Sequence, residues 1–140
     1  STAVKALKPS VRIVGVQAAA SPAYAESRKA GKPVEVPANP TVADGISCRR
    51  PGKNTYPIIE KNVDDIVTVE ENDILEATKL VAKETKLLAE PTSCVGIAAA
   101  LSKKIQLRPD EKTAFVLTSG NWDIDLLGKI YNDIKVEGVH

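Results

Sequence analysis

Aromatic residues are scarce in this chain of 140 residues, which has one Trp, one Phe and three Tyr. Few side chains are therefore available to stack on bases, and 19 basic against 18 acidic residues leave a formal net charge of only +1, without a basic stripe. Both features argue against a nucleic-acid partner. No apolar run approaches the roughly 20 residues of a membrane span, and no signal peptide precedes the first expected strand. We therefore expect a cytoplasmic protein without a membrane partner.

Metal-ligand patterns are also missing. The single histidine is the terminal His140, and the two cysteines, Cys48 and Cys94, lie far apart in the sequence. We expect both cysteines to be reduced, buried and structural. The chain has no methionine, even at its first position, and we expect that further sequence precedes it. Its length fits one modest domain or part of a larger one.

Apolar strand-like runs alternate with segments of helical period, which predicts an α/β fold with a parallel sheet flanked by helices. We expect strands at 11–17, 64–71 and 112–118, the first of them apolar on both faces and therefore central. The expected helices cover residues 1–8, 21–31, 56–62, 73–89, 91–104 and 123–131. The proline-rich stretch 32–57 is a long loop, and long ordered loops in compact domains usually serve a function.

Capping residues mark several of these helices. Ser21 is the expected cap of helix 21–31, which ends at Gly31. Asn72 or Asp73 is the expected cap of helix 73–89, and the apolar face of that helix is made of Ile74, Ala77 or Thr78, Val81, Thr85 and Leu88. The helix at 91–104 is rich in small residues, so we expect it to pack closely in the interior.

The stretch "FVLTSGNWDIDLL" (115–127) carries the first candidate site. Thr118, Ser119, Gly120 and Asn121 follow the third expected strand, and ligands of parallel α/β sheets collect beyond the carboxyl ends of strands. The two hydroxyls are able to hold a ring nitrogen or a phosphate, and Gly120 permits close backbone approach. Asn121 or Asp123 is a candidate cap of the next helix. A capped turn without any ligand is the alternative interpretation.

Glu90, in "LLAEPTSCVG" (87–96), is the second candidate. It precedes a helix that starts with Pro91, so its carboxylate is expected beside helix N-terminal amides, where the helix dipole favours negative charge. It either serves only as a helix-start acid or orients a ligand at the same rim of the sheet.

Five segments in order resemble the C-terminal half of the serine/threonine dehydratase and serine racemase family, whose members use pyridoxal phosphate. They are "ALKPSVRIVGV", "TVADGIS", "YPIIEKNVDDIVTVEENDI", "TKLLAEPTSCVG" and "FVLTSGNWDIDLL". The resemblance implies two α/β domains with the cofactor in the cleft between them. Residues 1–140 would be a single α/β unit, the latter part of the large domain of a fold type II pyridoxal-phosphate enzyme.

The resemblance implies that Thr118 places its hydroxyl against the pyridine nitrogen of the cofactor, with Ser119, Gly120 and Glu90 also at the cofactor site. Relatives often carry serine followed by glycine here, so the "TS" order is a departure, and Ser119 is able to share the role. A hydroxyl leaves the ring a weaker electron sink than a carboxylate would. That choice suits prompt loss of a β-substituent.

The implied reaction is the conversion of L-threonine or L-serine to a 2-oxo acid and ammonia, with serine racemisation as the alternative. Both need a lysine as Schiff-base nucleophile and general base. The family places that lysine in a Ser-x-Lys motif upstream, together with a glycine-rich phosphate cup. The Ser-x-Lys at Ser102 to Lys104 is interpreted as solvated charge at a helix end. We therefore expect this polypeptide alone to bind the cofactor weakly or not at all, and the missing N-terminal half to complete it.

The remaining family positions carry over unevenly. Gln17 and Ala23 stand where racemase-like members have acidic metal ligands, so no metal site is expected. Lys86 and Asn121 match positions that touch a nucleotide effector in racemases, although a surface charge and a helix cap are the simpler roles. We expect no regulatory domain after this chain, as in the short catabolic or racemase type, and the complete protein is expected to be a homo-oligomer.

Two other classes of function stay open. The chain is alternatively an anion-binding α/β module that uses the turn at 118–121 without chemistry, or a non-catalytic structural fragment that is held folded by a partner. Exposed apolar surface on strand 11–17 or on the alanine-rich helix would favour the fragment.

Overall fold

The computed structural model describes residues 1–37, 39–118, 120–121 and 124–131. Two strands, β1 (Val14–Ala18) and β2 (Asp65–Val69), pair in parallel, with Val14 opposite Asp65 and Ala18 opposite Val69. The helices are α1 (Thr2–Leu7), α2 (Ala23–Ala30), the 3-10 helix η1 (Asp44–Ile46), α3 (Thr55–Asn62), α4 (Glu71–Thr85), α5 (Pro91–Leu101) and α6 (Ile124–Tyr131). The expected α/β fold with a parallel sheet and flanking helices is confirmed.

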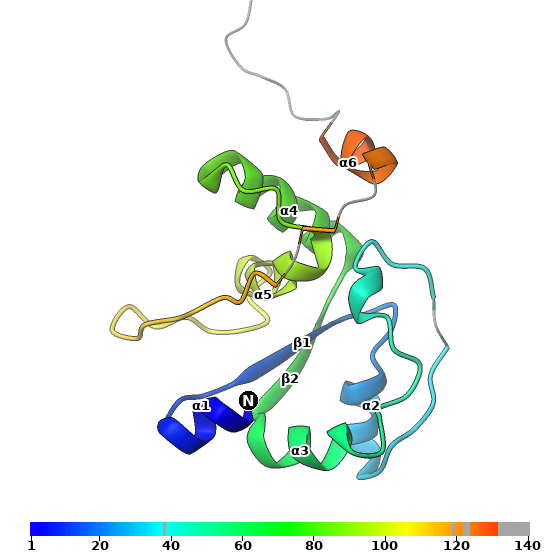
Figure 1. Ribbon diagram of the computed structural model, residues 1–140, viewed down its shortest axis with the longest axis vertical. Helices are drawn as coiled ribbons and strands as arrows, with labels where there is room; N and C mark the ends of the chain where they lie inside the picture. Colours follow the sequence, from blue (N-terminus) through cyan, green and yellow to red (C-terminus); the bar gives the residue numbers. More distant parts are fainter. Residues whose placement is uncertain (38, 119, 122–123, 132–140) are drawn as a thin grey trace, which may run out of the picture.

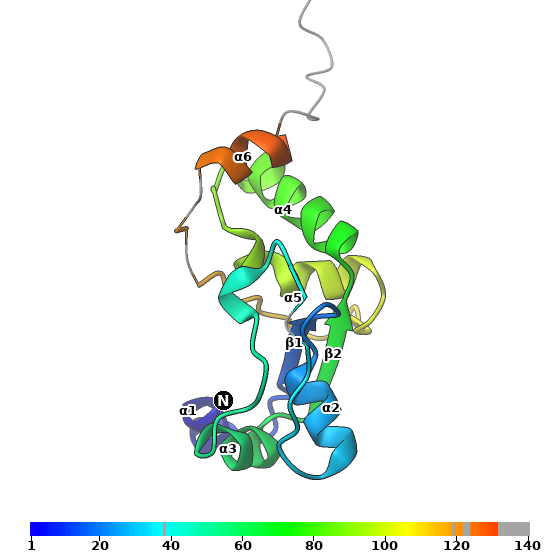
Figure 2. The same ribbon diagram turned by 90° about the vertical axis from the view of Figure 1, so that its right-hand side faces the viewer.

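Helices cover both sides of the strand pair (Figure 1). Helix α5 lies on one side and α2 on the other. In the view turned by 90°, α2 lies toward the lower part of the strands and α5 toward their upper ends (Figure 2). Both strands end on the side of the molecule where α4 begins and η1 lies. The carboxyl ends of parallel strands are where ligands of α/β sheets gather, so the relevant rim is formed by η1, α4 and the start of α5.

The core lies between the strand ends and the α4–α5 pair. It is built mainly from small side chains together with Val69 and Ile74, both fully buried. Alanines at positions 98 and 99 let α5 approach its neighbours closely, as the sequence predicted. Ile74, Ala77, Thr78 and Val81 form the buried face of α4, also as predicted, whereas Thr85 and Leu88 are exposed.

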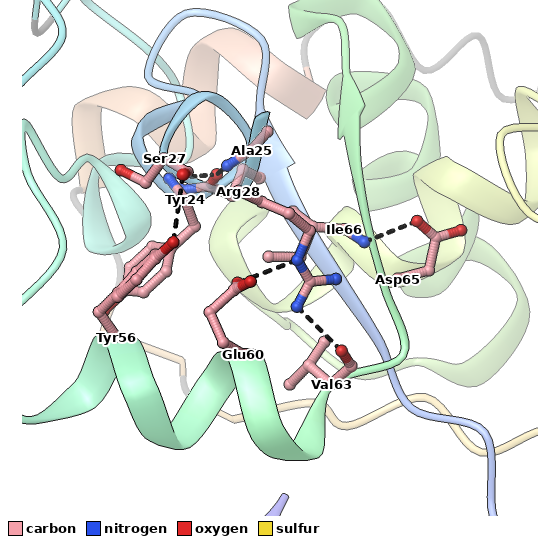
Figure 3. Close-up of polar contacts among 10 residues, drawn as sticks. Tyr24, Ala25, Ser27, Arg28, Tyr56, Glu60, Val63, Asp65 and Ile66 are labelled. Atoms are coloured by element: carbon pink, nitrogen blue, oxygen red, sulfur yellow. Dashed lines mark hydrogen bonds and ion pairs between the residues drawn. The ribbon is translucent and has the colours of Figure 1, made fainter. Parts of the chain in front are cut away.

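Helices α2 and α3 are joined by polar contacts (Figure 3). Arg28 donates from Nε to Glu60 Oε1 at 2.9 Å and from its guanidinium to the carbonyl of Val63 at 2.9 Å. The Tyr56 hydroxyl donates to the carbonyl of Ser27 at 3.2 Å. These hydrogen bonds hold α3, and with it the chain that leads into β2, against α2.

The described residues of the stretch, 32–37 and 39–57, are irregular apart from η1 and the first turn of α3, which confirms the predicted long loop. Ser21 anchors it, because its hydroxyl accepts from the backbone N–H of Cys48 and donates to the Cys48 carbonyl, both at 3.0 Å. The N–H of Val42 donates to Glu71 Oε2 at 2.8 Å. The loop is therefore held at both strand ends, and it brings Gly45 of η1 to the start of α5.

The third expected strand, 112–118, is wrong for the described residues. This segment has no ladder, and Val116 is 77% exposed. An apolar, β-branched run becomes a strand only when a neighbouring strand accepts its hydrogen bonds. The described part of the chain brings none beside it.

The predicted N-caps of α2 and α4 are also wrong. Ser21 makes no capping bond to α2, because its hydroxyl is used by Cys48; instead Gln17 Oε1 accepts from the N–H groups of Tyr24 and Ala25, both at 3.0 Å. Helix α4 starts two residues earlier than expected, so Glu70 occupies its N-cap position without a side-chain capping bond. Gly31, by contrast, ends α2 in the left-handed conformation with φ of 66°, as predicted.

Both cysteines are free, but only Cys94 is buried, while Cys48 is half-buried, which corrects the expectation for Cys48. None of the helices in the described ranges combines the length and hydropathy that a bilayer span requires.

Candidate functional site

The candidate site is built on the first turn of α5. Glu90 is the N-cap residue of this helix and Pro91 its first helical residue, so Glu90 lies beside the helix N-terminus as the sequence predicted. Proline is favoured there because its missing N–H would have no helical partner. The N–H of Ser93 closes the first turn by donating to the carbonyl of Glu90 at 2.9 Å. Ser93 itself is 4% exposed.

Thr118 is attached directly to this turn. Its backbone N–H donates to Ser93 Oγ at 3.1 Å, and its own hydroxyl lies 3.1 Å from the same Ser93 Oγ. Thr118 is exposed although its partner is buried. The sequence placed Thr118 at the rim of the sheet, and the structure brings it to the start of α5.

Two glycines allow neighbouring segments to approach the same helix start closely. A Cβ on Gly45 would lie 3.0 Å from Thr92 Oγ1, and a Cβ on Gly120 would lie 3.2 Å from the carbonyl oxygen of Leu88. Both distances are shorter than a comfortable van der Waals contact. Thr92 Oγ1 is buried and has no hydrogen-bond partner among the described residues. Buried hydroxyls in proteins are normally paired, so this one needs an explanation.

The titratable groups on the buried side of this turn, Cys94 and Tyr131, carry no charge near neutral pH. Burial raises the pKa of the Cys94 thiol, and the nearby Glu90 carboxylate raises it further, while a hydrogen bond with Thr78 opposes both effects. Burial, and the proximity of Cys94, raise the pKa of Tyr131 as well. Both groups are therefore neutral near pH 7, and Cys94 is a packing residue of the α4–α5 contact, as expected.

The other residues that the sequence predicted for the site lie either outside the described residues or on the exposed surface. Ser119 and Asp123 lie outside the described residues. Lys86 ends α4 in a left-handed conformation with φ of 63°, exposed, and Asn121 is exposed without helical structure. Sequence reasoning missed Gly45, Thr92 and Ser93. The available signal was the pair of hydroxyls directly after Glu90-Pro91, in the first turn of a predicted helix.

No group of three or more His, Cys, Asp or Glu within the described ranges could hold a metal ion. Gln17, which stands where a metal ligand was considered, has a structural function. Its Oε1 caps α2, and its Nε2 donates to the carbonyl of Ser21 at 3.4 Å.

A family model described as "Pyridoxal-phosphate dependent enzyme" matches residues 1–119. The chain belongs to this family. It is 41% identical over 130 residues to an L-threonine ammonia-lyase of Geobacter sulfurreducens, covering 93% of this chain and 32% of the relative. It is 42% identical over 130 residues to the serine racemase of Homo sapiens, covering 91% and 37%.

Two solved structures share this fold. One is a threonine deaminase of T.th., with a TM-score of 0.81 and 36% identity over 87% of this chain and 43% of that chain. The other is maize serine racemase, with a TM-score of 0.82 and 32% identity over 93% and 41%. The chain thus spans about a third of the length of the curated relatives named above.

The residues of the site fit one part of a pyridoxal phosphate molecule. The hydroxyl of the exposed residue Thr118 and the unpaired buried hydroxyl of Thr92 are groups that suit a ring with a ring nitrogen. The chain contains no glycine-rich run of the kind that cradles a phosphate. The donor set therefore fits the ring-nitrogen end of the cofactor.

Proposed function

We propose that this chain is the ring-nitrogen side of the active site of a pyridoxal-phosphate dependent L-threonine/L-serine ammonia-lyase, which releases a 2-oxo acid and ammonia. The observation that carries the proposal is the Thr118 hydroxyl, exposed at the rim of the sheet and bonded to the first turn of α5. When bound, the cofactor supplies an electron sink for the bond broken at the α-carbon of the amino acid.

The residues of this chain would bind and orient. Thr118 would hydrogen-bond the ring nitrogen, with Ser119 as a second hydroxyl, and a neutral partner keeps the electron sink moderate. Gly45 and Gly120 would let the segments around the site pack closely, since a Cβ at either position would lie only 3.0 Å from Thr92 Oγ1 or 3.2 Å from the Leu88 carbonyl oxygen. Glu90 would place a negative charge at the rim of the site, beside the start of α5.

We further propose that the missing N-terminal half supplies the Schiff-base lysine and the phosphate cup, since no glycine-rich run lies in this sequence. The coverage of about a third of each curated relative supports this division. The substrate would be a small hydroxy amino acid, and the complete protein a cytoplasmic homo-oligomer. Lys86 and Asn121 remain candidates for contact with a nucleotide effector.

Serine racemisation is the second candidate function. The identity of 42% to the human serine racemase equals, within a percentage point, the 41% identity to the bacterial threonine ammonia-lyase, so likeness alone does not favour either reaction. The two activities differ in their product, because racemisation retains the amino group and elimination releases it as ammonia.

The test uses the complete enzyme that carries this chain. Purified protein loaded with pyridoxal phosphate is incubated with L-threonine, L-serine or D-serine, and the products are assayed for 2-oxo acid, ammonia and the enantiomer of serine. The proposal expects a 2-oxo acid and ammonia in equal amounts from L-threonine or L-serine. Accumulation of D-serine without ammonia would replace it with the racemase.

Thr118→Val removes the hydroxyl with little change of volume, and the proposal expects it to lower kcat by about 10²-fold, the usual order for losing one oriented polar contact to reacting charge. Lys103→Ala is the control, because Lys103 is exposed beyond the far end of α5. An enzyme that binds pyridoxal phosphate but forms no product from any of these amino acids would contradict the proposal, as would Thr118→Val with unchanged kcat.

A further inference from the structure

Ser93 contacts both the backbone and the side chain of Thr118. Its Oγ accepts from the Thr118 N–H at 3.1 Å and lies 3.1 Å from Thr118 Oγ1. Two contacts to one residue restrain the backbone and χ1 together. Thr118 is thereby held at two points, although it is exposed.

The support of Ser93 is rigid. Its own N–H donates to the Glu90 carbonyl at 2.9 Å, within the first turn of a helix, and only 4% of the residue is exposed. The next residue, Cys94, is fully buried between α4 and α5. The position of Ser93 is therefore set by the packed core and does not depend on solvent. Threonine adds stiffness of its own, since β-branching restricts χ1.

We propose that Ser93 is a positioning residue that orients the Thr118 hydroxyl toward the cofactor's ring nitrogen and so sets the hydrogen bond made there. This inference rests on the function proposed above and extends it to a residue that does not touch the cofactor. A hydroxyl has one proton to donate and lone pairs that accept. A neighbouring group that hydrogen-bonds the Thr118 hydroxyl therefore determines whether its proton or a lone pair faces the cofactor ring. Side chains that orient the contacting residue in this way commonly determine how well a site functions.

The experiment measures the ring nitrogen directly. The complete enzyme is loaded with pyridoxal phosphate labelled isotopically at the ring nitrogen, and the nitrogen NMR resonance is recorded for the natural protein and for Ser93→Ala. The proposal expects Ser93→Ala to shift this resonance and to lower kcat about tenfold, with KM changed less than about twofold, because orientation and not binding is lost. Ser93→Thr, which keeps the hydroxyl, is expected to restore most of both values.

Ser102→Ala is the matched control. Ser102 lies at the opposite end of α5, where its hydroxyl donates to the Ala98 carbonyl at 2.7 Å, and the substitution removes the same chemical group from the same helix. We expect no shift of the ring-nitrogen resonance in this variant. If Ser93→Ala and Ser102→Ala behave alike, the inference is overturned, since Ser93 would then act only on stability.

A double-mutant cycle separates this inference from the proposed function. In a Thr118→Val background, Ser93→Ala should add no further shift, because the hydroxyl that it orients is gone. A further shift as large as in the natural background would show an independent effect and would overturn the inference. If Thr118→Val shifts the resonance but Ser93→Ala does not, the ring-nitrogen contact stands and the role of Ser93 fails. If Thr118→Val itself causes no shift, the proposed function loses its central contact.

A second variant tests the role of Ser93 if Ser93→Ala does not fold. Should Ser93→Ala fail to fold, Ser93→Cys takes its place, because a thiol retains a side chain of similar size while making only weak hydrogen bonds. The same resonance then decides. An unshifted resonance in a folded Ser93→Cys enzyme contradicts the proposal, and a shifted one supports it.

Discussion

At the scale of single residues, Asp64 shows how one carboxylate joins three segments. Its Oδ2 accepts from Lys5 Nζ of α1 at 2.7 Å and from the backbone N–H of Ile13, also at 2.7 Å, just ahead of β1. The Lys5 hydrogen bond, followed by that of Ile13, lowers the pKa of Asp64 from its ordinary value. The ion pair is exposed to solvent, so its effect is modest and sensitive to salt.

The pH dependence of Asp64→Asn follows from this shift. Because the folded-state pKa lies below the unfolded one, the carboxylate stabilises the fold above its unfolded pKa of about 3.9, and the contribution disappears as the pH falls through the folded value. We expect Asp64→Asn to lower Tm at about pH 7 and to match the natural protein at about pH 2. Thermal melts of the complete enzyme across this range measure the difference. Glu76→Gln, which removes an exposed ion pair with Lys79 inside α4, should change Tm little at any pH. A Tm difference for Asp64→Asn that persists undiminished in acid would contradict the assignment.

At the scale of elements, what the sequence could predict depended on how local the cause is. The buried face of α4 and the end of α2 at Gly31 follow from spacing and from a left-handed cap, both encoded within a few residues. The cap of α2 was not predictable in this way, because the group that caps it, Gln17, comes from β1, and Ser21 is engaged by a loop 27 residues away. The strand expected at 112–118 failed for the same reason, since a ladder needs a neighbour that no local pattern supplies.

The contact between α4 and α5 is the main apolar packing in the described chain, and Ile74 is its largest fully buried side chain. We expect Ile74→Ala to lower the free energy of unfolding by about 2 to 5 kcal/mol, because it removes apolar contact and leaves a cavity among side chains too small to refill it. Leu80→Ala on the same helix is the control, since Leu80 is 37% exposed, and it should cost less than about 1 kcal/mol. Urea unfolding of both variants of the complete enzyme gives the comparison. Equal losses would mean that the α4–α5 contact is not the stabilising one.

For the whole molecule, the sequence allowed the rim of the sheet to be predicted but not the way in which it is assembled. Thr118, Gly120 and Glu90 carried recognisable local signals: a hydroxyl and a glycine after an apolar run, and an acid before a proline-started helix. Gly45 had no such signal, and the hydroxyl of Ser93 after Glu90-Pro91 did not reveal its partner, because both roles depend on contacts across the fold, from Gly45 to Thr92 and from Ser93 to Thr118. A residue that supports another becomes visible only when the two are brought together.

The segment leading to Thr118 gives a test of how the whole enzyme completes this site. Val116 is 77% exposed and Leu117 is 38% exposed, in a segment without a ladder, whereas β1 and β2 are paired along their full lengths. An extended apolar segment that presents unpaired backbone groups is suited to accept a neighbouring strand.

In the complete enzyme, which we propose to be about three times as long as this chain, we expect the amides of residues 115–117 to become protected from hydrogen exchange. Amides of β2 serve as the internal reference, protected in both proteins because their partner β1 lies within this chain. Hydrogen-exchange mass spectrometry of the complete enzyme and of the 140-residue chain makes the comparison. If residues 115–117 exchange rapidly in both while β2 stays protected, Thr118 is not held at the end of a paired strand, and its rigidity rests on Ser93 alone.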